Sequence, residues 1–195
     1  MTTLTLERAK TSDAGWPQKA DCVDGNSRLA VMFTDMEGST RMIEELGEET
    51  ALTVLIEHHS IVRNQVAAHS GREVKNLGDG FLLEFPSARD AIDCAAAIQQ
   101  ALDDYNRSGP PRPVRTRCGI TVGEPLRHGP DLFGRCVVLA SRIVNEAHGG
   151  EILVSAELKD EVGPSAGVNF GRRWGIQAKG LRGAQSVFEV NWKPA

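Results

Sequence analysis

The stretch EVKNLGDGFLLEF, residues 73–85, carries the clearest structural signal in this 195-residue chain. Two strand-like segments, 73–77 and 81–85, flank the sequence Gly78-Asp79-Gly80. Small, flexible residues between two apolar runs are typical of a tight turn that joins antiparallel strands. We therefore predict a β-hairpin with Asp79 at its tip or just beside it.

A second aspartate follows another strong strand signal. The run LAVMF at residues 29–33 is continuously apolar, which favours a central strand buried on both faces, and Asp35 stands just after it. Taken singly, Asp35 could cap the following helix and Asp79 could satisfy a turn. Taken together, two carboxylates at strand ends would repel each other unless a hard divalent cation lay between them. The pair therefore predicts a metal site.

The residues after Asp35 indicate what the metal would accompany. A short helix is predicted over residues 38–46, and the free backbone N–H groups at a helix start favour phosphate. A metal and nucleotide site is the functional hypothesis that follows.

The rest of the chain supplies further helices and strands. A long helix ending at Gly71 is predicted to bury an apolar stripe, and Ser87 with Asp90 resembles a capping box that opens a helix through Leu102. The stripe consists of Leu52, Leu55, Ile56, His59, Val62 and Val66. The later segments are a strand at 114–122, a loop at 123–130, a helix at 134–148, a strand at 151–154, a short helix at 156–162 and a terminal strand pair at 168–176 and 185–190.

This order of elements predicts an α+β fold (an α/β sandwich) with a ferredoxin-like core, an antiparallel sheet and flanking helices. Residues 1–27 are polar and lack periodicity, so we expect a flexible N-terminal leader before one domain over residues 28–195. Neither a signal peptide nor an apolar stretch of membrane-spanning length is recognisable, which favours a cytoplasmic protein.

Composition narrows the function classes. Hydrophobic residues make up 41% and charged residues 25%, as in ordinary globular proteins. The net charge of −4, from 22 basic and 26 acidic residues, argues against a general nucleic-acid binder. The four cysteines, Cys22, Cys94, Cys118 and Cys136, show no metal-binding spacing and are predicted to be reduced, mostly buried thiols.

Four segments together resemble the catalytic domain of class III nucleotidyl cyclases, especially the bacterial adenylyl cyclases. They are FTDMEGST at 33–40, KNLGDG at 75–80, DLFG at 131–134 running into ASR at 140–142, and KGL at 179–181. The first three in this order are specific, whereas the last alone is weak. The resemblance covers about residues 28–192.

The resemblance implies a role for each matching position on the phosphate side of the substrate. Asp35, Asp79 and the backbone carbonyl of Met36 would bind two divalent cations, Mg²⁺ or Mn²⁺, which assist attack of the ribose 3′-hydroxyl on the α-phosphorus. The triphosphate would be held by the N–H groups of Glu37, Gly38, Ser39 and Thr40 and by Lys179, with Arg182 as a less certain helper.

Base selection and catalysis are implied at three other positions. Lys75 would donate to adenine N1 and Asp131 would accept from the exocyclic amine, a combination that favours ATP over GTP. Arg142 would stabilise the charge on the α-phosphoryl oxygens in the transition state. Without the resemblance, a solvated lysine, a turn aspartate and a surface arginine would be the simpler interpretations.

One position departs from the family pattern. An asparagine usually stands four residues before the catalytic arginine, but this chain has Val138, which cannot donate a hydrogen bond. Asn145, one turn beyond Arg142, is a poor substitute. We therefore expect slow turnover. The alternative is a nucleotide-binding regulatory module that has lost useful catalysis.

The resemblance also implies a partner. Cyclase sites form between two catalytic domains, so we expect a head-to-tail homodimer in which Asp35 and Asp79 come from one protomer and Lys75, Asp131 and Arg142 from the other. Another two-metal nucleotidyl transferase, such as a dinucleotide cyclase, is disfavoured because a Gly-Gly-Asp/Glu-Glu-Phe hairpin is absent from the sequence. The histidines His58, His59 and His69 and the tryptophans Trp16 and Trp174 are assigned to packing or surface roles.

Overall fold

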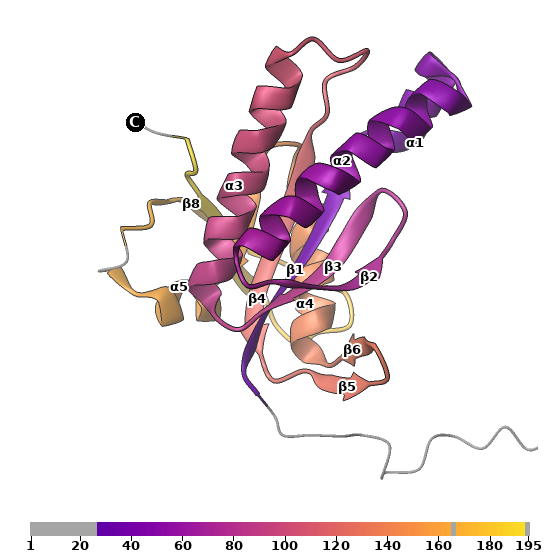
Figure 1. The fold of residues 1–195 in the computed structure, drawn as a ribbon. Helices are drawn as coiled ribbons and strands as arrows, with labels where there is room; N and C mark the ends of the chain where they lie inside the picture. The colour runs from indigo at the N-terminus through magenta and orange to yellow at the C-terminus, as the bar shows by residue number, and fades with distance from the viewer. Residues whose placement is uncertain (1–26, 165–166, 194–195) are drawn as a thin grey trace, which may run out of the picture.

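The computed structural model describes residues 27–164 and 167–193 (Figure 1). Seven strands form one sheet in the order β2-β3-β1-β4-β7-β9-β8, and two short strands, β5 and β6, form a separate hairpin. The strands are β1 (Leu29–Met36), β2 (Arg72–Asn76), β3 (Gly80–Phe85), β4 (Thr116–Gly123), β5 (Leu126–His128), β6 (Asp131–Phe133), β7 (Ile152–Ser155), β8 (Phe170–Ile176) and β9 (Gln185–Val190).

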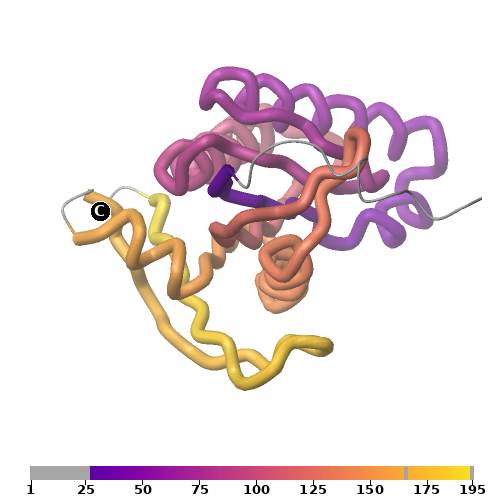
Figure 2. The backbone as a smooth tube through the Cα atoms, turned by 90° about the horizontal axis from the view of Figure 1, so that it is seen from below, coloured from indigo at the N-terminus to yellow at the C-terminus, as the bar shows by residue number. Residues whose placement is uncertain are grey.

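Helices cover both faces of this sheet. They are α1 (Ser39–Leu46), α2 (Glu48–Ala68), α3 (Ala88–Arg107), α4 (Arg135–Glu146) and α5 (Ala156–Val162). Figure 2 shows α4 on the opposite side of the sheet from α2 and α3, with the β8–β9 ribbon curving away at the end of the molecule. The predicted α+β class is confirmed. The sheet is antiparallel except for the neighbouring pair β4 and β7, which is parallel.

The continuous apolar run at the start of β1 has a direct structural reason. Strand β1 lies inside the sheet between β3 and β4, so both of its faces are covered. Ala30 and Met32 point into the main core with α2 and α3, while Val31 packs with α4 on the other face. Because successive side chains alternate between faces, a strand covered on both sides needs apolar residues at every position.

The predicted stripe of α2 is partly wrong. Leu52 and Ile56 are 56% and 57% exposed, whereas the buried face of the helix contains Ala51, Val54, His58, Val62 and Val66. The predicted and the buried series share Val62 and Val66, but in the first half of the helix the buried residues lie one position before the predicted ones. Hydrophobic spacing alone could not distinguish them.

The predicted loop at residues 123–130 is also wrong, because it contains β5, which pairs with β6 from Leu126↔Phe133 to His128↔Asp131. Strands of three residues are too short to show an alternating pattern. Other local signals held. The amide of Asp90 donates to the Ser87 hydroxyl (3.1 Å) at the start of α3, as the capping box requires.

The cysteine prediction is confirmed within the described residues, where Cys94, Cys118 and Cys136 are buried free thiols. Trp174 packs at the edge of a smaller core cluster, as predicted. Cys22, Trp16 and the predicted leader up to residue 26 lie outside the described residues. None of the helices in the described part of the chain combines the length and the apolar character that crossing a membrane requires.

His58 is fully buried beneath the end of β4. Its Nε2 lies 2.8 Å from the Thr116 hydroxyl, and its Nδ1 has no hydrogen-bond partner among the described residues. The pKa of His58 is lowered from 6.5 to about 4, mainly by burial and to a smaller extent by the neighbouring His59, while Asp79 acts in the opposite direction. The folded protein therefore holds a neutral imidazole.

Acid should destabilise the fold through this residue. Below pH 6.5 the unfolded chain takes up a proton at His58 that the folded chain excludes until about pH 4, so stability falls as the pH decreases through that window. Between pH 7 and pH 5 the loss is about 2 kcal/mol. Urea unfolding at the two pH values should show a smaller loss for His58→Gln than for the wild type. Equal losses in the two proteins would contradict this account.

Candidate active site

The two predicted carboxylates are brought together by backbone pairing. Asp35 lies near the end of β1, opposite Gly80 of β3, and Asp79 lies in the turn just before β3. The N–H of Met36 donates to the carbonyl oxygen of Asp79 at 3.1 Å. A Cβ at position 80 would lie only 2.0 Å from the carbonyl oxygen of Thr34, so glycine is required there. The hairpin turn is thus fastened directly to the end of β1.

Each carboxylate has a polar partner. Arg117, on β4 opposite Asp35, contacts Oδ2 of Asp35 through Nη2 (2.6 Å) and Nε (2.7 Å). The hydroxyl of Ser39 donates to Oδ2 of Asp79. Arg117 therefore compensates the negative charge of Asp35, which lowers its repulsion with other nearby carboxylates. Arg117 could not be predicted from the sequence, because its place beside Asp35 depends on the pairing of β1 with β4.

Helix α1 begins directly beside these carboxylates. Gly38, its N-cap residue, is in the left-handed conformation with φ of 69° and has no side chain to accept from the first-turn amides. The N-terminal end of α1, which contains Ser39 and Thr40, is therefore suited to an anion. Glu37 differs from the other predicted phosphate residues, because its N–H donates to the Arg115 carbonyl (2.8 Å) and its carboxylate accepts from the Gly149 amide (3.1 Å).

A hollow of about 430 Å³ opens beside the same groups. Ser39, Thr40, Glu48 and Asp79 form its polar part. The rest of its wall consists of Gly78 and apolar side chains of α1 and α2. The carboxylates, the helix start and this hollow together form the first half of the candidate site.

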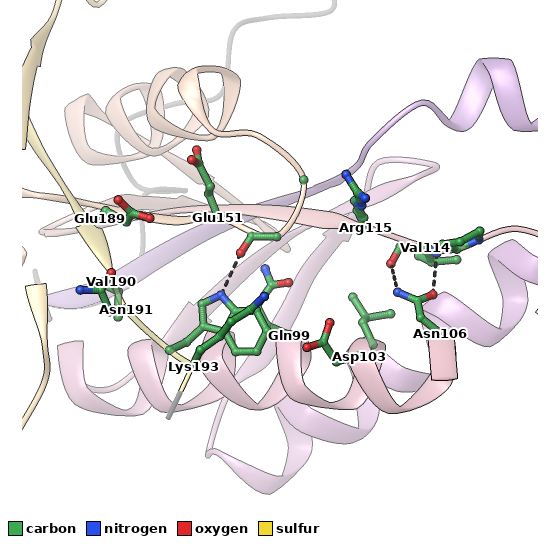
Figure 3. Close-up of a pocket in the computed structure, with 15 residues that line it drawn as sticks. Gln99, Asp103, Asn106, Val114, Arg115, Glu151, Glu189, Val190, Asn191 and Lys193 are labelled. Atoms are coloured by element: carbon green, nitrogen blue, oxygen red, sulfur yellow. Dashed lines mark hydrogen bonds between the residues drawn. The ribbon is translucent and has the colours of Figure 1, made fainter. Parts of the chain in front are cut away.

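A larger cavity, of about 780 Å³, lies elsewhere, between α3 and the chain that follows β9 (Figure 3). None of the predicted site residues lines it. The Asn106 side chain is bonded to both backbone groups of Val114, and the Trp192 indole donates to the Gly150 carbonyl. These polar groups already have hydrogen-bond partners within the protein. The candidate site is therefore the smaller hollow, which lies beside Asp79 and the start of α1.

Lys75 and Asp131 form a close pair, although 56 positions separate them in the chain. The Lys75 ammonium on β2 lies 2.8 Å from Oδ2 of Asp131, the first residue of β6. The hydrogen bond from Lys75 holds the pKa of Asp131 below its usual value. A cationic donor and an anionic acceptor therefore stand side by side at the surface.

Arg142 and Lys179 are also brought together. Arg142 lies on α4, and its Nε is 3.4 Å from the backbone carbonyl of Lys179 in the loop after β8. Val138, one turn earlier on α4, is 38% exposed. The side-chain amide of Asn145 donates to the Ser141 carbonyl of its own helix at 2.9 Å, so it is not aimed at a ligand.

These residues form two groups within one chain. One group contains Asp35, Asp79 and the start of α1; the other contains Lys75, Asp131 and Arg142. Across the described ranges, no hydrogen bond or ion pair links the two groups, and no cluster of three or more His, Cys, Asp or Glu side chains is arranged to hold a metal. Any cation at Asp35 and Asp79 would therefore need further oxygen ligands, from the backbone or from a substrate.

Comparison with known proteins places this arrangement in a family. The model of the adenylate and guanylate cyclase catalytic domain matches residues 23–191. The chain is 33% identical over 142 residues to the putative adenylate cyclase 3 of Rhizobium meliloti, covering 72% of this chain but only 24% of that relative.

Solved structures agree on the fold. The guanylyl cyclase Cya2 superposes with a TM-score of 0.77 at 24% identity, over 84% of this chain and 91% of that chain. The adenylyl cyclase CyaB from P. aeruginosa superposes with a TM-score of 0.73 at 23% identity, over 84% and 93%. The family model matches a region that includes all five of the residues Asp35, Asp79, Lys75, Asp131 and Arg142. The chain therefore belongs to the family of adenylate and guanylate cyclase catalytic domains.

Proposed function

We propose that this domain is an adenylyl cyclase that converts ATP to 3′,5′-cyclic AMP and pyrophosphate. The observation that carries the proposal is the 2.8 Å pair of Lys75 and Asp131 in a chain that also brings Asp35 and Asp79 together. The edge of adenine presents an acceptor at N1 and a donor at the exocyclic amine. Lys75 offers the matching donor and Asp131 the matching acceptor, whereas guanine inverts this pattern.

The phosphate half of the substrate would be held by the first group. The amide N–H groups at the start of α1, around Gly38, Ser39 and Thr40, would donate hydrogen bonds to the β- and γ-phosphates, and Lys179 would add a positive charge. Glu37 would contribute through its contact with Gly149, which fixes the segment before the helix.

The same group fits two divalent cations, Mg²⁺ or Mn²⁺. Asp35 and Asp79 present carboxylate oxygens, and the Met36 carbonyl would add a third hard ligand of the type these cations prefer. When bound, the cations would favour ionisation of the ribose 3′-hydroxyl and neutralise the departing pyrophosphate.

Arg142 would act where charge accumulates in the reaction. The 3′-oxygen attacks the α-phosphorus, the bond from the α-phosphorus to the bridging oxygen of the β-phosphate breaks, and pyrophosphate leaves with that electron pair. A guanidinium beside the α-phosphoryl oxygens stabilises the transition state more than the ground state. Such a contribution is worth about 10²–10³ in rate.

Both groups would meet at composite sites in a head-to-tail homodimer. Lys75, Asp131 and Arg142 of one protomer would face Asp35 and Asp79 of its partner. This arrangement is supported by the separation of the two groups within the described chain and by the presence of both groups in it. A two-fold dimer of this kind contains two equivalent sites.

The direct test is product formation from ATP and from GTP, with Mg²⁺ and with Mn²⁺. We expect cyclic AMP from ATP, little product from GTP, and no product from Asp35→Ala, which lacks one of the two carboxylates. Tight ATP binding without a cyclic product would instead favour the alternative, a catalytically weakened regulatory module, whose supporting observation is Val138.

Mixing two inactive variants tests the composite sites. Asp35→Ala and Arg142→Ala should each be inactive, but their heterodimer contains one site in which both groups are intact. With random exchange of protomers, about a quarter of the sites are restored, so activity should reach about a quarter of the wild-type value. Heterodimers verified by mass spectrometry that remain inactive would refute the shared site.

Restoring the family residue should accelerate turnover. In Val138→Asn, an amide would stand one helical turn before Arg142 at a position that is already 38% exposed, so the fold has room for it. We expect kcat to rise about tenfold or more, because one well-placed donor to a developing charge contributes at least that much. Val138→Ala is the matched control and should leave kcat near the wild-type value. An unchanged kcat in Val138→Asn would show that the missing amide does not limit this enzyme.

A further inference from the structure

A buried carboxylate fastens the hairpin that carries Asp131. Glu84 on β3 is only 8% exposed, and it is the one acidic residue that is buried in the described part of the chain. It accepts from two arginines: Arg72 on β2 through Nε (2.6 Å) and Arg127 on β5 through Nη2 (2.8 and 3.1 Å). A buried carboxylate shared by two cations links three separate strands.

The alternation of side chains explains why this contact faces the hairpin. On β3, Phe81, Leu83 and Phe85 belong to the core under α2 and α3, so Leu82 and Glu84 point to the opposite face. On the hairpin, Arg127 and Leu132 are directly paired across β5 and β6, so their side chains share one face.

These two faces meet at matched positions. Leu132 packs in the same buried cluster as Leu82, and Arg127 reaches Glu84, the next residue on that face of β3. A third contact is the pair of Lys75 and Asp131, and Lys75 is the β2 neighbour of Leu82. Three contacts in a row, one apolar and two ionic, therefore set where Asp131 stands relative to Lys75. In Figure 1 the hairpin lies below the main sheet beside α4, outside the hydrogen-bonded order of the seven strands.

We propose that Glu84 is a positioning residue for nucleotide selectivity. Together with Arg127 and Arg72, it holds the β5–β6 hairpin in the place where Asp131 lies beside Lys75. This inference rests on the proposed selection of adenine by that pair. Glu84 does not touch the base. It acts through Arg127, and loss of its charge leaves two arginines without their shared anion and releases the polar attachment of the hairpin.

The selectivity ratio is the decisive measurement. The ratio of kcat/KM for ATP to kcat/KM for GTP does not depend on the fraction of folded enzyme, so general destabilisation does not alter it. We expect this ratio to fall about tenfold in Glu84→Gln and in Arg127→Met, which matches the loss of one positioned hydrogen bond. Arg127→Lys, which keeps a donor and the charge, should retain most of the selectivity.

Glu73→Gln is the matched control. Glu73 is also a strand glutamate paired with an arginine, Arg63, at 2.7 Å, but this pair joins β2 to α2 and does not reach the hairpin. Its ratio should remain at the wild-type value. Hydrogen exchange provides a second readout that needs no turnover: amides of residues 126–133 should exchange faster in Glu84→Gln and Arg127→Met, but not in Glu73→Gln.

The outcomes separate the two proposals. If Asp131→Ala abolishes ATP selectivity while Glu84→Gln and Arg127→Met preserve it, adenine selection stands and the positioning role is overturned. Unchanged exchange of the hairpin in both variants overturns the positioning role whether or not the enzyme turns over. A wild-type enzyme without ATP preference overturns both proposals, because there is then no selectivity for the hairpin to set.

Discussion

The contact between the end of β1 and the turn before β3 is the constraint on which the site depends. The Met36 amide bonds to the Asp79 carbonyl, and Gly80 allows the turn to approach the Thr34 carbonyl more closely than any Cβ would permit. Two acidic residues far apart in the sequence are consequently held beside each other where two interior strands of the sheet, β1 and β3, meet the turn. Backbone hydrogen bonds and close packing fix this approach, so the main chain alone determines that Asp35 and Asp79 lie near each other.

The two faces of the sheet have different tasks. The face under α2 and α3 holds most of the large buried apolar side chains and therefore most of the hydrophobic stabilisation. The opposite face carries α4 and the β5–β6 hairpin over smaller clusters, and it presents Lys75, Asp131 and Arg142. The residues proposed to select the base and to catalyse the reaction thus lie on the less heavily packed side, where short elements are fastened by a few ionic contacts.

The sequence was sufficient wherever the signal was local. Asp79 in a Gly-Asp-Gly turn and Asp35 after an apolar run could be predicted, because turn chemistry and strand burial are written in neighbouring residues. Arg117, Glu84 and the packing of His58 could not, since each depends on which strand or helix lies opposite. The exposed Leu52 and Ile56 are another case in which local sequence is not sufficient. Two apolar series fit one helix, and only the tertiary contacts decide which of them is buried.

The pairing of Arg117 with Asp35 bears on whether the protein folds before or after it binds cations. Many small metal-binding domains remain unfolded until the ion arrives, because their ligands have no other source of charge compensation. Here an arginine on the neighbouring strand already compensates one of the carboxylates at 2.6 Å. The polypeptide can therefore complete its fold first and meet cations afterwards. Under the proposed function, the supply of divalent ions would govern how fast each molecule works, while the number of folded molecules would be set independently by synthesis and degradation.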